Sequence, residues 1–119
     1  MIFHKIDILC IQEHNIKEQS KLEYVEKHCI VILNTTHLLK GGTAVLINKL
    51  SQVKIINNEM DTKGQILSVK CCIAEIVFQI INVYAPSGND KRKEREELFN
   101  TDLLYFVRNN LKNVIIAGD

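Results

Sequence analysis

The 119-residue sequence has no long hydrophobic run and no excess of charge of one sign. No apolar stretch approaches the roughly 20 residues that a helix needs to cross a bilayer, so no membrane partner is expected. Lys and Arg number 15 against 14 Asp and Glu, which leaves a formal net charge of +1. Since nucleic-acid-binding proteins often carry a basic excess, the overall composition indicates no particular partner.

The cysteines lack the pattern of a zinc site or of a disulfide framework. They form no C-x-x-C pair, and the adjacent Cys71 and Cys72 would point to opposite faces of a strand. No secretory leader is recognisable ahead of them. We therefore expect reduced, mostly buried thiols in an intracellular protein. The four cysteines are Cys10, Cys29, Cys71 and Cys72.

What the sequence does have is the composition and patterning of one folded domain. Its 46% hydrophobic and 24% charged residues are typical of a globular chain. Short apolar runs predict strands, and the two longest are close enough in sequence for an antiparallel hairpin, although no Asn-Gly or Asp-Gly marks a turn. The predicted strands cover residues 6–12, 30–33, 43–48, 65–72, 75–84 and 114–117.

From about residue 91 to residue 110 the period of the apolar residues becomes helical. Asp90 is a candidate N-cap, and the basic residues 91–93 oppose the helix dipole, so the helix is expected to start nearer Glu94. A further helical turn is expected around residues 19–27. The content predicts an α/β (α+β) class. The apolar stripe comprises Leu98, Phe99, Leu103, Phe106, Val107 and Leu111.

Three predicted strands end in polar or acidic residues, Glu13, Tyr84 and Asp119. Strand ends in a packed sheet can converge on one crevice, where ligands commonly bind. Two carboxylates and a phenol there would suit a hard cation and a phosphate, because Mg²⁺ prefers one or two carboxylates with water and substrate oxygens. Such a metal can orient a phosphoryl group, and a second carboxylate can activate water.

Four phrases in this order resemble the endonuclease/exonuclease/phosphatase family, and they are most similar to the apurinic-endonuclease-like domains of non-LTR retrotransposons. The phrases are DILCIQE at residues 7–13, GGTAVLI at 41–47, NVYAPS at 82–87 and VIIAGD at 114–119. The resemblance implies a four-layered α/β/β/α sandwich with mixed, mostly antiparallel sheets. It also implies a metal-dependent endonuclease that nicks DNA in the nucleus to prime reverse transcription.

The resemblance assigns a role to each of the three strand-end residues. It implies that Glu13 holds the divalent metal, Mg²⁺ or Mn²⁺. It implies that Tyr84 contacts the scissile phosphate or supports its transition state. Asp119 would orient or activate the attacking water. The partner of the intact domain would be DNA.

The chain departs from the family pattern at both ends. The asparagine of a first strand, a later aspartate and a Ser-Asp-His ending are not found, so residues 1–119 are expected to be a single incomplete domain without its first strand and C-terminal half. Without these groups the isolated chain should not cleave DNA at a useful rate. The absent half should also supply most of the second sheet, which would leave Ile76, Phe78 and Ile80 exposed or paired with another chain.

Other interpretations remain open at this point. The chain could belong to another member of the same fold, such as an abasic-site endonuclease, exonuclease or phosphatase. It could also be a non-catalytic interaction or structural module in which Glu13 is a solvated strand-end residue. The basic residues between Lys91 and Arg95 suit either a DNA backbone or a solvated helix start.

Overall fold

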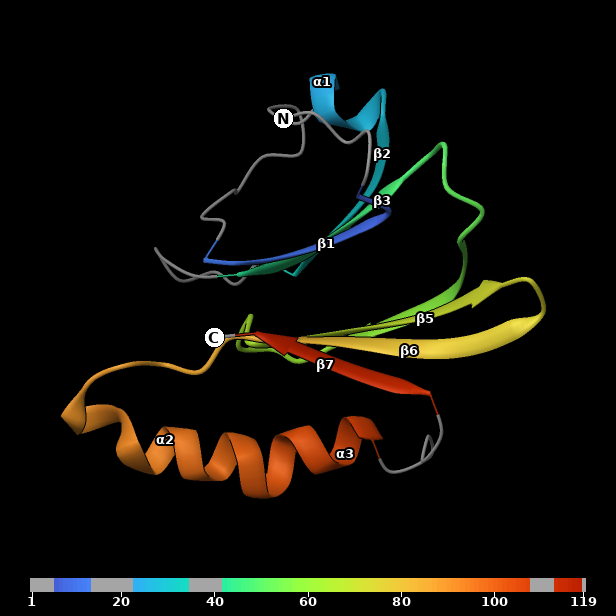
Figure 1. The fold of residues 1–119 in the computed structure, drawn as a ribbon. Helices are drawn as coiled ribbons and strands as arrows, with labels where there is room; N and C mark the ends of the chain where they lie inside the picture. The colour runs from blue at the N-terminus through green and yellow to red at the C-terminus, as the bar shows by residue number, and fades with distance from the viewer. Residues whose placement is uncertain (1–5, 14–22, 35–41, 108–112, 119) are drawn as a thin grey trace.

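The computed structural model describes residues 6–13, 23–34, 42–107 and 113–118 (Figure 1). A three-stranded sheet has the order β1-β3-β2 and faces a four-stranded sheet of order β4-β5-β6-β7. All strand pairs are antiparallel except β6 and β7, which are parallel. The strands are β1 (Ile8–Gln12), β2 (Cys29–Asn34), β3 (Thr43–Asn48), β4 (Lys54–Met60), β5 (Ile66–Ile73), β6 (Ile76–Val83) and β7 (Val114–Gly118).

Helices lie on the outer faces of the two sheets. The helix that links β6 to β7 packs on the four-stranded sheet and consists of η2 (Asn89–Lys91), α2 (Arg92–Glu97), a π-helical turn η3 (Leu98–Asp102) and α3 (Leu103–Val107). On the other side, Val25 of the short α1 (Glu23–Glu26) packs against the outer face of the three-stranded sheet. The predicted α/β/β/α class with mostly antiparallel sheets is confirmed.

The helix begins earlier than the sequence predicts. Its first turn starts at Asn89, and α2 starts at Arg92. Asp90 is not the N-cap, because Gly88 precedes η2 and neither Gly88 nor the residue before α2 makes a side-chain capping bond. Phe99 of the predicted stripe is about half exposed, while its neighbour Leu98 is buried. The helical turn expected around residues 19–27 is confirmed by α1 (Glu23–Glu26). Residues 14–22 and 108–112, among them Leu111, lie outside the described part of the chain.

One strand, β4, is absent from the sequence prediction. Its side chains are almost all exposed, and a register shift interrupts its pairing with β5 between Ile55 and Asn57. An edge strand of this kind buries neither face fully, so it shows no alternation of polar and apolar residues. The other predicted strands are confirmed with ends that differ by one or two residues.

The predicted hairpin of β5 and β6 is confirmed, and its turn explains the missing sequence signal. Ile73 pairs with Ile76, so the turn consists of Ala74 and Glu75 alone. Both have positive φ, 49° and 67°. Two-residue hairpins favour such angles, and Asn-Gly or Asp-Gly usually supplies them. Here ordinary residues adopt them, so no turn motif is visible in the sequence.

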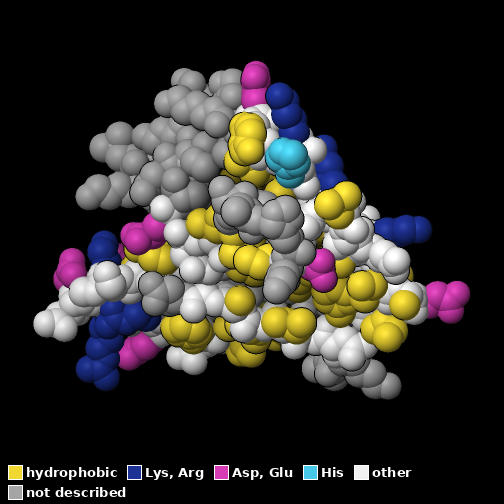
Figure 2. Space-filling view, turned by 45° about the horizontal axis from the view of Figure 1, so that its top comes forward, with side chains coloured by type: hydrophobic (Ala, Val, Ile, Leu, Met, Phe, Trp, Pro, Cys, Tyr) yellow, Lys and Arg dark blue, Asp and Glu magenta, His cyan; other side chains and the backbone are white. Residues whose placement is uncertain are grey.

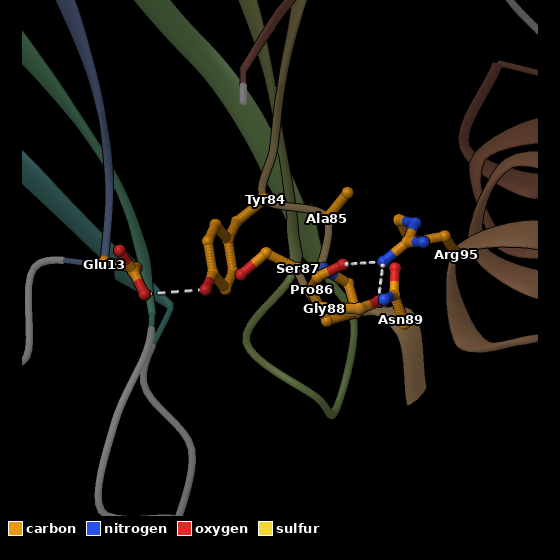
Figure 3. Close-up of a pocket in the computed structure, with 8 residues that line it drawn as sticks. All are labelled: Glu13, Tyr84, Ala85, Pro86, Ser87, Gly88, Asn89 and Arg95. Carbon is orange, nitrogen blue, oxygen red and sulfur yellow. Dashed lines mark hydrogen bonds between the residues drawn. The ribbon is translucent and has the colours of Figure 1, made fainter. Parts of the chain in front are cut away.

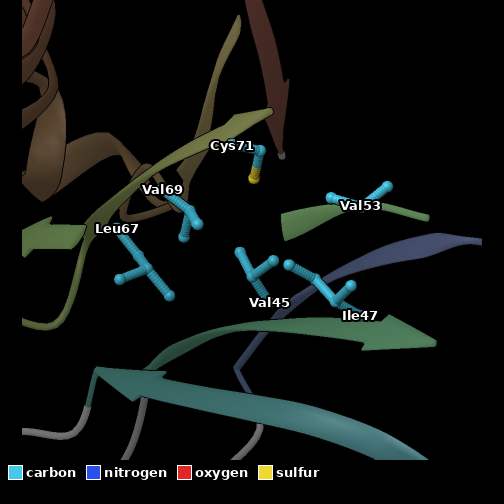
Figure 4. Close-up of a cluster of buried hydrophobic side chains, with 6 residues drawn as sticks. All are labelled: Val45, Ile47, Val53, Leu67, Val69 and Cys71. Atoms are coloured by element: carbon cyan, nitrogen blue, oxygen red, sulfur yellow. The ribbon is translucent and has the colours of Figure 1, made fainter. Parts of the chain in front are cut away.

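The main core lies between the two sheets (Figure 4). Phe78 packs against it, and Ile80 is only 4% exposed. The prediction that these two side chains would be uncovered is therefore wrong, because the first 48 residues already supply a covering sheet. Ile76, which is 57% exposed, does fit that prediction. The buried residues of this core are Val45, Ile47, Val53, Leu67, Val69 and Cys71.

A second core forms beneath the helix from Ile66, Ile81, Val83, Leu98 and Phe106. All four cysteines carry free thiols, as predicted, and Cys29 and Cys71 are buried. In the described ranges no helix is long and apolar enough to span a membrane.

Candidate active site

The site lies at one end of the sandwich, where strands from both sheets finish. Gln12 ends β1 in the three-stranded sheet, and Val83 ends β6 in the four-stranded sheet. In the parallel pair of β6 and β7, Val83 lies opposite Gly118, so the carboxyl ends of these two strands coincide. Asp119 is outside the described residues. The strand-end residues that the structure places are therefore Glu13 and Tyr84.

Glu13 and Tyr84 are in direct contact. The Tyr84 hydroxyl donates a hydrogen bond of 2.6 Å to Glu13 Oε1 (Figure 3). The backbone N–H of Tyr84 donates to the carbonyl of Gln65 at 2.8 Å, which fixes the start of the loop after β6. The two residues are 71 positions apart in sequence, and they come from different sheets.

The backbone of Glu13 has an unfavourable conformation. Its φ is 53°, in the left-handed region. For a residue with a Cβ this costs about 1 kcal/mol or more, and such strain persists only where the surrounding structure imposes it. The strained residue follows β1 directly and carries the carboxylate that meets Tyr84.

Glu13 and Tyr84 line an open pocket of about 460 Å³ together with the loop that follows β6 and Arg95. Arg95 of α2 donates from one guanidinium nitrogen to the carbonyls of Pro86 at 3.0 Å and Gly88 at 2.7 Å. The helix therefore holds the loop in place. The loop residues that line the pocket are Ala85, Pro86, Ser87, Gly88 and Asn89.

Arg95 was not identified as a site residue by the sequence. It belongs to the basic run at the helix start, and its neighbours Lys91 and Arg92 form ion pairs with Glu94 and Glu96 on the solvent side. Only the geometry separates Arg95, whose partners are loop carbonyls, from these surface pairs. Backbone carbonyls carry no sequence signal.

Two further polar residues beneath the pocket were also not identified. Gln12 Nε2 donates to Asn82 Oδ1 at 2.5 Å. Asn82 is fully buried and donates to the carbonyls of Ile11 at 2.9 Å and Ala44 at 2.8 Å. The sequence signal that could have identified them is a single polar residue on the otherwise apolar inner face of β1 and of β6.

The pocket offers one carboxylate and one guanidinium, with the hydroxyls of Tyr84 and Ser87 nearby. Among the described residues no cluster of three or more His, Cys, Asp or Glu side chains could enclose a metal. A single carboxylate with an open side nevertheless fits Mg²⁺ or Mn²⁺, which keep water and substrate oxygens as most of their ligands. The donor set suits a cation shared with an anionic substrate.

Known structures share this fold. TDP2 from Caenorhabditis elegans aligns with a TM-score of 0.72 at 15% identity, over 95% of this chain and 37% of that one. D. rerio TDP2 complexed with single strand DNA product aligns with a TM-score of 0.71 at 17% identity, over 95% and 47%. The 3′-5′ exonuclease NExo from Neisseria meningitidis aligns with a TM-score of 0.67 at 20% identity, over 95% and 46%.

These neighbours are of the endonuclease/exonuclease/phosphatase type, so the likeness shows that fold for the present chain. The chain spans less than half the length of each of the three structures. The sequence matches no protein-family profile and no curated protein.

Proposed function

We propose that the chain is part of a divalent-metal-dependent phosphodiesterase whose intact domain cuts DNA. The contact between Glu13 and Tyr84 at converging strand ends is the observation that carries the proposal. The contact brings a carboxylate and a phenol close enough to act on the same phosphate. The fold shared with a TDP2 that holds a DNA product and with a 3′-5′ exonuclease supports the same substrate class.

Each pocket residue has a distinct task in this proposal. Glu13 holds Mg²⁺ or Mn²⁺, which when bound would neutralise charge that develops on the phosphoryl oxygens. Tyr84 places its hydroxyl against the same phosphate. Arg95 braces the loop, and its positive charge favours an anion in the pocket. Asp119, which lies outside the described residues, would orient or activate the attacking water, as the family resemblance implies.

DNA binding would depend on this pocket and on parts of the domain beyond these residues. On the face shown in Figure 2, acidic and basic side chains are mixed around the rim, with hydrophobic side chains in the middle. With a net charge of +1, the chain has little general attraction for a phosphate backbone. Nicking of chromosomal DNA for retrotransposition, in the nucleus, is the specific reaction that the four sequence phrases favour.

We further propose that residues 1–119 form an incomplete domain that lacks its first strand and its C-terminal half. The coverage of less than half of each neighbour supports this. The isolated chain should then leave supercoiled plasmid intact in Mg²⁺ or Mn²⁺. Robust nicking that disappears in Glu13→Gln would contradict the proposed inactivity of the chain and would support the phosphodiesterase assignment.

The metal assignment is tested by calorimetric titration of the 119-residue chain with Mn²⁺. Because one carboxylate makes a sparse site, we expect saturable binding in about the millimolar range. Glu13→Gln should abolish it. Glu75→Gln is the matched control, since Glu75 is also exposed with positive φ at the opposite end of β6. Absence of saturable binding would favour the alternative, a non-catalytic module.

Self-association is a second proposal, and it rests on the open edge of the four-stranded sheet. In the described part of the chain β7 pairs with β6 alone, and Ile115 and Ile116 are each 55% exposed. Exposed apolar edge strands favour pairing with another chain. Light scattering should therefore show oligomers that Ile116→Lys shifts toward monomer. Leu104→Lys, which changes an equally exposed helix residue, should leave the oligomers unchanged.

A further inference from the structure

A row of polar side chains crosses the inner face of the three-stranded sheet at the site end. The strand register places Gln12 opposite Thr43, and Thr43 opposite Asn34. Beyond this row the inner face is apolar and forms the main core. Thr43 and Asn34 are almost completely buried, and Asn82 faces the row from β6. Burial of polar groups is unfavourable unless they are hydrogen-bonded, so the partners of this row matter.

The side chain of Asn82 makes three hydrogen bonds to the other sheet. Both protons of its amide nitrogen are used, one on the carbonyl of Ile11 and one on that of Ala44. Its amide oxygen accepts from the side chain of Gln12. These three bonds tie β6 to β1 and β3 across the core. A fully satisfied buried amide fixes one arrangement of the groups that it joins.

The tie lies directly beneath the pocket. Gln12 immediately precedes Glu13, and Asn82, the last residue but one of β6, is two residues before Tyr84. Glu13 and Tyr84 belong to different sheets, so their 2.6 Å contact depends on how the two sheets are aligned at this end. Within the described ranges, the bond between the Gln12 and Asn82 amides is the direct side-chain link from β1 to β6.

We infer that Gln12 and Asn82 are positioning residues that hold Glu13 against Tyr84. The inference rests on the proposed function, since it gives the pair a task in the same site. The second bridge of the row starts from Asn34, which donates to Asp61 Oδ1 at 3.0 Å and to the carbonyl of Ile66 at 2.8 Å. It ties β2 to the β4–β5 connection and to the first residue of β5 instead. It contributes to the joining of the sheets but does not adjoin Glu13.

The experiment follows the hydrogen bond itself, without metal. The 119-residue chain is labelled with ¹³Cζ-tyrosine, and the Tyr84 signal among the three tyrosines is assigned with Tyr84→Phe. In the wild-type background, Glu13→Ala should shift the Tyr84 Cζ resonance because the phenol loses its acceptor. In a Gln12→Met background we expect most of that shift to be lost, since the contact is already broken. Gln12→Asn, which keeps the amide on a shorter side chain, should behave in the same way.

Asn34→Leu is the matched control. It removes a buried amide bridge from the same row, so it should lower stability while the response of Tyr84 to Glu13→Ala stays as in wild type. The inference is overturned if the response persists in Gln12→Met and Gln12→Asn, or if Asn34→Leu abolishes it equally. Because no metal is present, failure of Mn²⁺ to bind would count against the proposed function and leave this result unaffected.

Discussion

Two glutamates in this chain share a backbone conformation and differ in everything around it. Glu13 has φ 53° and Glu75 has φ 67°, and both are exposed at an end of a strand. Glu75 completes the two-residue turn of the β5–β6 hairpin, beside the exposed Ile76 and Val77. Glu13 meets Tyr84 and a pocket at the other end of β6.

The difference shows what backbone strain does and does not indicate. At Glu75 a tight hairpin requires positive φ, and the strain has a purely structural origin. At Glu13 the same strain coincides with a side-chain contact between sheets and with buried amides beneath it. A strained residue therefore indicates a candidate site only where other polar groups converge on it.

The largest expected effect concerns the buried amides that distinguish the site end. Asn82→Ala would leave the Gln12 amide and the carbonyls of Ile11 and Ala44 without their partner. We expect the free energy of unfolding to fall by about 3 kcal/mol in urea denaturation. Asn58→Ala, on the exposed strand β4, should change it by less than about 0.5 kcal/mol. A similar loss of unfolding free energy in the two variants would mean that the buried amides at the site end are no more important for stability than an exposed one.

A smaller effect is expected from relief of backbone strain at the two glutamates. Glycine tolerates positive φ, so Glu75→Gly should raise the free energy of unfolding by about 0.5–1 kcal/mol. Glu13→Gly should gain less, because it also loses the bond from Tyr84. Thermal or urea unfolding of both variants measures the difference. An equal gain at the two positions would mean that the Tyr84 contact contributes nothing to stability.

A third effect, seen only at high pH, concerns the apolar layer between the two ends. Burial raises the pKa of the Cys71 thiol from 9.0 to about 11, and the proximity of Cys10 adds to the rise. The neutral thiol is thus favoured in the folded state, so its contribution is complete below pH 9 and declines as pH rises through 11. Between pH 8 and pH 11, the free energy of unfolding measured in urea should decrease more steeply for wild type than for Cys71→Ala. The same pH dependence in the two proteins would contradict a raised pKa for the Cys71 thiol.

Much of this arrangement could be predicted from the sequence, because strand alternation is a local property. The alternation along β1 and β6 located both strand ends, and the expected convergence of strand ends grouped Glu13 and Tyr84 with Asp119. The family resemblance then gave each of them a role. The likeness in fold to TDP2 and NExo agrees with that resemblance, while its retrotransposon assignment stays a prediction.

The remaining features depend on contacts that local patterns do not encode. β4 is an edge strand whose side chains face solvent, so it has no period. Arg95 contacts loop carbonyls, which any residue can supply. The burial of Ile80 follows from a covering sheet formed elsewhere in the chain. The role of Asn82 depends on its amide partner Gln12, which lies 70 residues away in the sequence.

The proposed function requires a divalent metal to bind at Glu13, beside Tyr84. Paramagnetic broadening of the three tyrosine Cζ resonances by Mn²⁺ measures this binding. We expect Tyr84 to broaden first and Glu13→Gln to abolish the effect, while Tyr24 and Tyr105 stay sharp although they are 70% and 52% exposed. Equal broadening of all three tyrosines, or broadening of Tyr84 that survives Glu13→Gln, would contradict it.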